Sequence, residues 1–326
     1  MRVGQNPAKF VKEVAKPARV TVAILTYIPF QSGFYAETLN VLKVTLNSLH
    51  ANTGIPFDLL LFDNGSCAEV QDFLLEEQRA GRIQYLLLSE KNLGKGGAWN
   101  FILAGAPGEI IAYADSDVLF LPGWLERSLE ILETYPNTGM VTSRPFRTKE
   151  EFFTASLDWA RAAGVELTEG QLIPYETFAE FNRSLGAADA EIRENYAASR
   201  DVRVSYQGVT AQLGASHWQF VAYKSVLQAF LPFDMSRPMG QVRQLDERMN
   251  AAGKLRLMVP DPLVLNMSNT LIGVPEEYLR GVSGRSAAPV EGARGWKARL
   301  LELPPLKKIF LWLYNQIFHW YYYEQP

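Results

Sequence analysis

The sequence contains few of the residues that build covalent or metal-centred frameworks. Its 326 residues include one cysteine, Cys67, and three histidines. A single cysteine excludes an internal disulfide and every zinc motif built on several cysteines, and three histidines are too few for a histidine-rich metal cluster. The chain is therefore expected to fold on its apolar core, in a reducing compartment.

Strong net charge and long apolar runs are absent as well. The formal net charge is −3, so the composition does not favour a nucleic-acid partner, and any anion site has to be local. No run of about 18 apolar residues is present, and residues 1–19 lack the apolar stretch of a signal peptide. These absences predict a cytoplasmic protein with an N-terminal arm at residues 1–19.

The C-terminal segment 303–323 comes nearest to a membrane span, but Asn315, Gln316 and His319 interrupt it. Its Trp and Tyr residues predict an amphipathic helix lying on the inner face of the membrane. Basic residues that could meet anionic lipid are Arg285, Arg294, Lys297, Arg299, Lys307 and Lys308. A helix packed on the protein itself or on a second subunit is the alternative, so a homo-oligomer stays open.

The remaining composition, 48% hydrophobic and 21% charged, is that of a globular chain. Strands are expected at 20–26, 57–62, 83–88, 109–114 and 139–142, and helices at 38–52, 68–79, 97–104 and 122–135. This alternation predicts an α/β nucleotide-binding half over residues 20–147. A helical insertion at 148–203, an acceptor-binding half at 204–280 and a linker with the C-terminal helix at 281–326 are expected to follow. In the acceptor-binding half, strands are expected at 204–213, 217–223 and 255–260 and a helix at 239–252.

Two acidic residues follow the buried strand expected at 109–114. Asp115 and Asp117 are separated by Ser116. Carboxylates so close together repel each other unless a cation lies beside them, and hard divalent ions prefer oxygen ligands. The pattern predicts a divalent metal that holds a diphosphate. A turn leading into the next helix is the alternative.

Two further motifs follow other expected strands. Asp63-Asn64-Gly65-Ser66 ends the second strand, where an aspartate can accept hydrogen bonds from a base or ribose and a glycine permits close approach. An ordinary loop that caps the next helix is the alternative for these four residues. The glycine-rich segment Asn92–Asn100 follows the third strand and predicts a backbone anion site at a helix start. A flexible turn with Trp99 in the core is its alternative.

The order of these motifs resembles the inverting family 2 glycosyltransferases, which have the A-type glycosyltransferase fold with a Rossmann-like mixed sheet. The resemblance covers residues 20–140 and implies that Thr26 and Asp63 contact the nucleobase. It also implies that the turn with Asn92, Gly94 and Lys95 lies near the nucleotide. It further implies that Asp115 faces ribose or metal and that Asp117 binds the metal, Mn²⁺ or Mg²⁺.

The later half matches the family more loosely. Residues 244–253 look like its acidic helix, whose carboxylate deprotonates the acceptor, so Asp246 is the expected base, with Glu247 second and Asp234 third. Ion pairing on a solvated helix face is the alternative for Asp246 and Glu247. Asn266 stands where many relatives carry a histidine on the metal. The resemblance leaves His217 and Trp218 as acceptor contacts or as core residues.

The function predicted from these residues is a metal-dependent, inverting transfer of a sugar from a nucleotide-diphosphate donor, UDP favoured. The acceptor is expected to be a glycan or lipid-linked hydroxyl group in surface polysaccharide or glycolipid synthesis. A sugar-1-phosphate nucleotidyltransferase and a non-catalytic nucleotide-sugar or glycan-binding protein are the alternatives. The former needs a glycine-rich loop with arginine after the first strand, where this chain has Tyr27-Ile28-Pro29.

Overall fold

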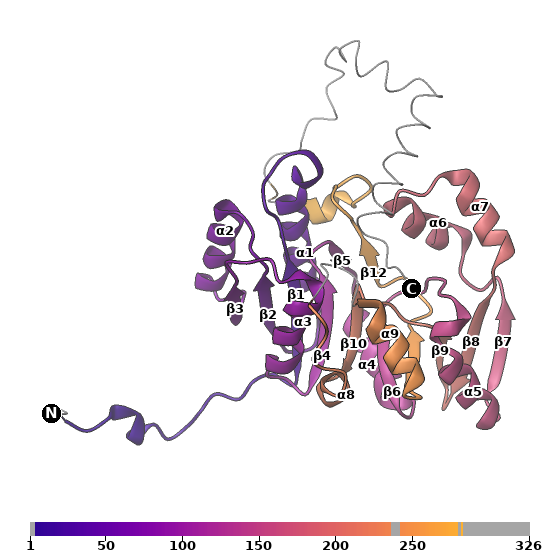
Figure 1. The fold of residues 1–326 in the computed structure, drawn as a ribbon, viewed down its shortest axis with the longest axis horizontal. Coiled ribbons are helices and arrows are strands. Elements are labelled where there is room, and N and C mark those ends of the chain that lie inside the picture. Colours follow the sequence, from indigo (N-terminus) through magenta and orange to yellow (C-terminus); the bar gives the residue numbers. More distant parts are fainter. Residues whose placement is uncertain (1–3, 236–241, 280–281, 283–326) are drawn as a thin grey trace, which may run out of the picture. The chain divides into compact units, whose positions relative to one another are not determined.

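The computed structural model of the chain describes residues 4–235, 242–279 and 282 (Figure 1). The predicted C-terminal helix at 303–323 and its basic residues lie outside these ranges. The described residues other than Val282 belong to one unit, residues 1–281.

Ten strands form one mixed sheet in the order β3-β2-β1-β4-β10-β6-β11-β9-β8-β7. In chain order their bounds are β1 Val20–Thr26, β2 Phe57–Asp63, β3 Tyr85–Leu88, β4 Ile110–Asp115, β6 Thr138–Thr142, β7 Glu166–Gly170, β8 Asp201–Tyr206, β9 Val209–Leu213, β10 Gln219–Tyr223 and β11 Leu255–Met258. Strands β1 to β4 pair in parallel, and β10 pairs antiparallel with both β4 and β6. A second sheet holds β5 Val118–Phe120 and β12 Val264–Asn266. Because β1, β2 and β4 run in the same direction, their carboxyl ends meet at one edge.

Helices cover both faces of the large sheet (Figure 1). Their bounds are α1 Thr38–Asn52, α2 Ala68–Arg79, α3 Gly94–Gly105, α4 Trp124–Thr134, α5 Thr154–Ala162, α6 Tyr175–Ser184, α7 Asp189–Ala198, α8 Lys224–Gln228 and α9 Val242–Ala251. Short 3₁₀ helices span Pro7–Phe10, Gly33–Tyr35, Glu150–Phe152 and Glu276–Leu279.

The alternation of side chains along each strand separates two cores. Val22 and Ile24 of β1 pack with α1, α2, α4 and α5, whereas Ala23 and Leu25 pack with α3, α8 and α9. Trp99 of α3 is fully buried in the second core. A strand covered on both faces reads as a continuous apolar run, which is why VTVAIL at 20–25 predicts a strand without showing which side faces a helix.

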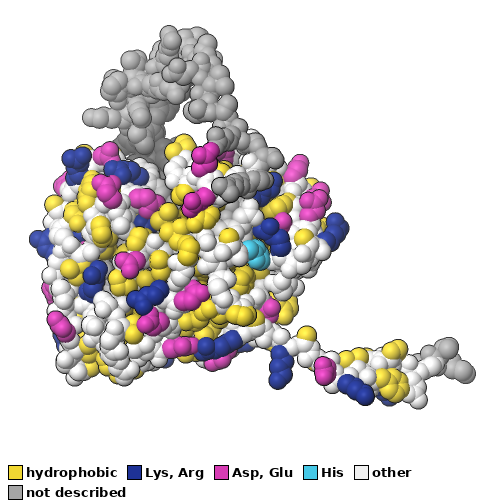
Figure 2. Space-filling model, turned by 180° about the vertical axis from the view of Figure 1, so that it is seen from behind, with side chains coloured by type: hydrophobic (Ala, Val, Ile, Leu, Met, Phe, Trp, Pro, Cys, Tyr) yellow, Lys and Arg dark blue, Asp and Glu magenta, His cyan; other side chains and the backbone are white. Residues whose placement is uncertain are grey.

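The predicted mixed α/β sheet is confirmed, because parallel strands β1 to β4 and antiparallel strand β10 share one sheet. The segment expected as one strand at 204–213 is instead the hairpin β8–β9, because Gln207 and Gly208 both adopt positive φ and turn the chain. The segment expected to be helical, 148–203, contains α5, α6 and α7 but also β7. Charges of both signs are interspersed on the face drawn in Figure 2.

Candidate active site

The carboxyl ends of β1, β2 and β4 lie side by side in register. Thr26 pairs with Asp63 across β1 and β2, and Leu25 pairs with Asp115 across β1 and β4. The main chain of Asn64 donates to the carbonyl group of Thr26 at 2.9 Å. The structure therefore brings together two of the three motifs that follow predicted strands.

Asp63 holds its own loop. Its fully buried carboxylate accepts hydrogen bonds from the main chain of Ser66 at 3.2 Å and from Nε2 of Gln71 at 3.1 Å. Gly65 has a φ of +93°, and a Cβ there would lie 3.2 Å from the main-chain nitrogen of Asn92. These contacts are those expected if the segment is an ordinary loop before a helix. Nucleobase recognition by Asp63 stays a prediction.

Asn64 ties the loop after β2 to the start of α3. Its Nδ2 donates to Oδ1 of Asn92 at 3.0 Å, and its Oδ1 accepts from the main chain of Leu93 at 2.9 Å. Asn92 Oδ1 also accepts from the main chain of Gly94 at 2.8 Å. Asn64 lines the cavity and was missed by the sequence reasoning, although its place beside Asp63 after a strand was a sufficient signal.

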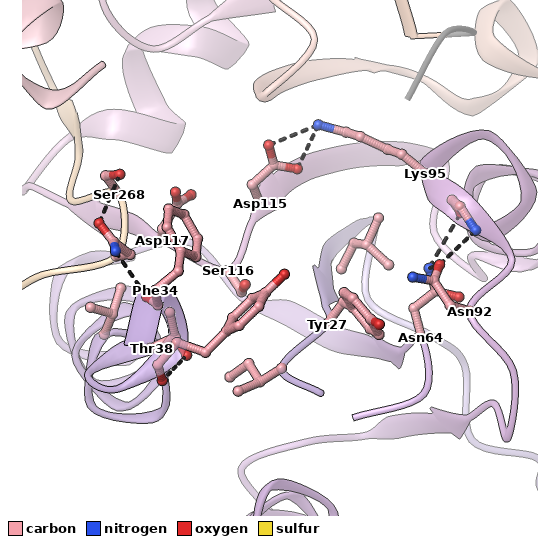
Figure 3. A pocket seen from close by; sticks show the side chains of 16 residues that line it. Tyr27, Phe34, Thr38, Asn64, Asn92, Lys95, Asp115, Ser116, Asp117 and Ser268 are labelled. Carbon is pink, nitrogen blue, oxygen red and sulfur yellow. Dashed lines mark hydrogen bonds and ion pairs between the residues drawn. The ribbon is translucent and has the colours of Figure 1, made fainter. Parts of the chain in front are cut away.

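The glycine-rich segment is the first turn of α3, which begins at Gly94 and not at Gly97 as predicted. A Cβ at Gly97 would lie 2.8 Å from Cβ of Leu93, so a larger residue would force the chain apart. The third motif thus reaches the same edge of the sheet as Asp63 and Asp115. The helix start directs Lys95 toward Asp115 (Figure 3).

Lys95 and Asp115 form an ion pair in which the lysine side chain is 9% exposed. The ammonium nitrogen of Lys95 lies 2.7 Å from each carboxylate oxygen of Asp115. The hydroxyl group of Tyr113 donates to Oδ1 of Asp115 at 2.6 Å, and burial, followed by the charge of Asp115, raises the pKa of Tyr113 well above its usual range. Lys95 and Tyr113 therefore fix the position of the Asp115 side chain.

Asp117 has no such partner. Its Oδ1 is buried and accepts no hydrogen bond from the described residues. Burial, with the nearby charge of Asp115 as the second cause, raises the pKa of Asp117 to about 7, against the opposing influence of Lys95. A buried, unpaired carboxylate oxygen is the environment that a bound cation relieves.

Few side chains near Asp117 could bind a metal ion. Within the described ranges no group of three or more His, Cys, Asp and Glu side chains is placed to hold a metal ion. Metal binding by Asp115 and Asp117 therefore stays a prediction.

Strand β12 reaches this site from the distant end of the described chain. The main chain of Met267 donates to the carbonyl group of Asp117 at 2.8 Å. Oδ1 of Asn266, the predicted third ligand, accepts from the main chain of Ser268 at 2.9 Å. Ser268 and Asn269, rather than Asn266, line the cavity.

These elements surround a cavity of about 400 Å³ (Figure 3). Polar lining comes from Asn64, Asn92, Lys95, Asp115, Ser116, Asp117, Ser268 and Asn269. Apolar and aromatic lining comes from Leu25, Tyr27, Ile28, Phe34, Tyr35 and Val41. Thr26 and Asp63 do not line the cavity. The walls thus combine flat rings with anion-binding and cation-binding groups.

The predicted acceptor residues lie beside Asp115. The main chain of Asp115 donates to the carbonyl group of Trp218 at 2.9 Å, which continues the pairing of β4 with β10. The Trp218 ring stacks on Phe181 at 5.7 Å and is buried. Nδ1 of His217 lies 3.0 Å from Oδ2 of Asp246.

The other base candidates lie elsewhere or engage other partners. Glu247 is exposed and pairs with Arg243 one turn away at 2.9 Å, as the solvated-face alternative expects. Asp234 is described but precedes residues 236–241, which the structure does not describe.

No helix within the described residues is long and apolar enough to cross a membrane.

Comparisons with known proteins agree with this architecture. A family model described as "Glycosyl transferase family 2" matches residues 33–188. An uncharacterized glycosyltransferase of Nostoc sp. is 31% identical over 102 residues, which are 31% of this chain and 31% of that protein. One of Rickettsia bellii is 29% identical over 122 residues, which are 37% of this chain and 16% of that protein. The chain thus spans less than half the length of these relatives.

Among solved structures, one of a mannosyltransferase from Pyrobaculum calidifontis in complex with GDP-Man and Mn²⁺ is 16% identical with a TM-score of 0.45. The similarity covers 78% of this chain and 57% of that one.

Proposed function

Because residues 33–188 match the model of glycosyl transferase family 2, we propose that this chain transfers a sugar from a nucleotide-diphosphate donor to an acceptor hydroxyl group with inversion at the anomeric carbon. The observation that carries this proposal is the cavity at the carboxyl ends of β1, β2 and β4, where Lys95, Asp115 and Asp117 gather. Ligands of open parallel sheets bind at this edge.

The walls of the cavity suit the two ends of such a donor. Tyr27 and Tyr35 offer flat apolar faces to a nucleobase, and Asn64 and Asn92 offer amide groups to its edge or to ribose. We place the diphosphate next to Asp115 and Asp117. UDP is the donor nucleotide to test first.

Asp115 and Asp117 would hold a Mn²⁺ or Mg²⁺ ion, because the buried Oδ1 of Asp117 lacks a partner among the described residues. When bound, the ion would supply positive charge to the departing diphosphate. Lys95 orients Asp115 and carries a fixed positive charge at the same place.

The acceptor would enter beside His217 and Trp218, which border Asp115 through the main chain. A glycan or a lipid-linked hydroxyl group, used in surface polysaccharide or glycolipid synthesis, is the acceptor class we propose. A sugar-1-phosphate nucleotidyltransferase would need a glycine-rich loop with arginine after β1, where this chain has Tyr27-Ile28-Pro29.

The test is a thermal-shift titration of the full chain with UDP, GDP and dTDP, with and without Mn²⁺. A nucleotide diphosphate at 100 times its Kd should add about 2.7 kcal/mol to the free energy of unfolding. The shift should require Mn²⁺ and should be lost in Asp117→Ala. Equal Mn²⁺-dependent shifts in Asp117→Ala and the parent would contradict the assignment.

Donor turnover separates an enzyme from a binding protein. The parent chain should hydrolyse the preferred nucleotide sugar slowly without acceptor, and proton NMR of the glycoside formed with acceptor should show inverted anomeric configuration. A chain that binds the donor tightly but neither hydrolyses nor transfers it is a binding protein.

A further inference from the structure

Three side chains from distant parts of the sequence form a connected polar cluster. His217 precedes β10, Asp246 lies on α9, and Arg256 lies on β11. Oδ2 of Asp246 is 3.0 Å from Nδ1 of His217, and its Oδ1 is 2.5 Å from Nη2 of Arg256. Each oxygen of this carboxylate therefore has its own partner.

Arg256 fixes the carboxylate and balances its charge. The arginine side chain is 1% exposed, and it also donates to the carbonyl groups of Phe152 and Ala215 at 2.6 Å each. Both oxygens of Asp246 already accept hydrogen bonds, and its side chain is 10% exposed, so a substrate hydroxyl group has little access to it. Asp246 is thus better suited to orienting a neighbour than to accepting a proton from substrate.

His217 is more accessible to a substrate than Asp246. Its side chain is 34% exposed, whereas that of Asp246 is 10% exposed. A carboxylate oxygen only accepts hydrogen bonds, so Nδ1 carries the hydrogen in the neutral ring and Nε2 is left with a lone pair. Among the described residues the ring makes no hydrogen bond other than that to Asp246.

The position of His217 relative to the donor site follows from the sheet. The carbonyl group of the next residue, Trp218, accepts from the main chain of Asp115 at 2.9 Å. Residue His217 therefore lies at the same edge of the sheet as Asp115, one strand along. Asp246 is the base predicted from the sequence. Its connection to this edge of the sheet is the hydrogen bond with the ring of His217.

Resting on the proposed function, we propose that His217 is the general base of the transfer, with Asp246 as its positioning residue and Arg256 as the residue that fixes Asp246. The acceptor oxygen forms a bond to the anomeric carbon while the bond from that carbon to the diphosphate oxygen breaks with its electron pair. The hydroxyl proton passes to Nε2 of His217, and Asp246 stabilises the imidazolium formed.

The experiment compares His217→Gln, Asp246→Asn and the double variant, with His50→Gln as the matched control. His50 lies on α1 and contacts Phe57 rather than the cavity. The assay uses the nucleotide sugar and alkyl glycoside that the parent turns over fastest. His217→Gln should lower kcat by about 10²–10⁴ with donor KM within about threefold of the parent, while His50→Gln stays at parent level.

Three readouts distinguish a base from a structural residue. The double variant should be no slower than His217→Gln, because groups that act as a unit are non-additive. Added imidazole should restore part of the activity of His217→Ala. The acidic limb of the kcat–pH profile should disappear in His217→Gln, where the charged groups facing the ring are Asp246 and, behind it, Arg256.

If His217→Gln keeps more than a third of the parent kcat while Asp246→Asn loses activity, the carboxylate itself is the base and the inference is wrong. If imidazole fails to rescue a folded His217→Ala that still binds nucleotide diphosphate, the inference is also wrong. An inactive parent would instead overturn the proposed function.

Discussion

The charges at the donor site are balanced by individual side chains. Lys95 bonds both oxygens of Asp115, whereas Oδ1 of Asp117 lacks a partner among the described residues. Two carboxylates that face one ammonium group leave a net negative site. At the scale of single residues, Lys95 therefore determines how strongly the site needs a further cation.

Lys95→Met should make the chain more dependent on metal. Removing the ammonium group leaves Asp115 unpaired next to Asp117, so the free energy of unfolding in EDTA should fall by about 1–3 kcal/mol. Mn²⁺ should then raise the melting temperature of the variant by more than that of the parent. Lys91→Met, an exposed change nearby, is the control; equal Mn²⁺ effects in Lys95→Met and the parent would contradict this account.

His50 makes stability depend on pH. Burial, and secondarily the charge of Arg82, lowers the pKa of His50 below its usual value of about 6.5. The unfolded chain therefore binds the proton more readily, so the stability that His50 contributes is present above about pH 6.5 and is lost as pH falls through the lowered value.

His50→Gln removes this titration. Urea unfolding of the parent and of His50→Gln at pH 7.5, 6.5 and 5.5 should show the parent losing stability relative to the variant as pH falls. A difference between the two proteins that stays constant over this range would show that His50 titrates alike in the folded and unfolded states.

At the scale of elements, one ion pair holds the inserted segment together. Arg147 donates to both oxygens of Asp201 at 2.7 and 3.2 Å, and its side chain is 8% exposed while that of Asp201 is fully buried. Asp201 also accepts from the main chains of Leu172 and Ile173. The guanidinium group of Arg147 lies 4.4 Å from the ring centre of Tyr196. The pair thus connects the start of β8 with the chain on either side of α6 and α7.

Arg147→Met should destabilise this region. It leaves Asp201 buried without its counter-ion, and breaking such a pair costs about 3–5 kcal/mol. Urea unfolding measures the loss, and hydrogen exchange should show it first in α6 and α7. Glu176→Gln, an exposed change on α6, is the control. A loss below about 0.5 kcal/mol would contradict the role assigned to this pair.

At the scale of the whole chain, the two halves of the large sheet would supply different parts of the proposed reaction. The parallel strands β1, β2 and β4 bring the cavity residues to one edge, and β10, which runs the other way, begins there directly after His217 and Trp218. The predicted membrane contact belongs to residues 303–323, outside the described residues.

Deleting residues 303–326 tests that contact. If this segment binds anionic lipid, the full chain should sediment with phosphatidylserine-containing vesicles at low salt and the truncated chain should not, while both bind nucleotide diphosphate equally. Sedimentation should weaken in high salt, because basic residues are screened. A full chain that stays in the supernatant at low salt contradicts the membrane prediction.

Local sequence signals were enough to predict the first α/β half of the fold and the place of its two aspartates. The bounds of β1, α1 and α2 agree with the predicted ones, because apolar periodicity and strand-end polar residues are local signals. The same local reading predicted that Asp115 and Asp117 follow a buried strand, and β4 ends at Asp115.

Which side chains lie together depends on the three-dimensional packing of the chain. Asn64 lines the cavity and Asp63 does not. This difference depends on the direction in which each side chain points from a tight turn, which the sequence does not specify. The cluster of His217, Asp246 and Arg256 depends on the order of β10, β6 and β11 in the sheet and on α9 covering them. Such contacts join residues far apart in the chain, and they form because the sheet buries its faces as a whole rather than through any local preference.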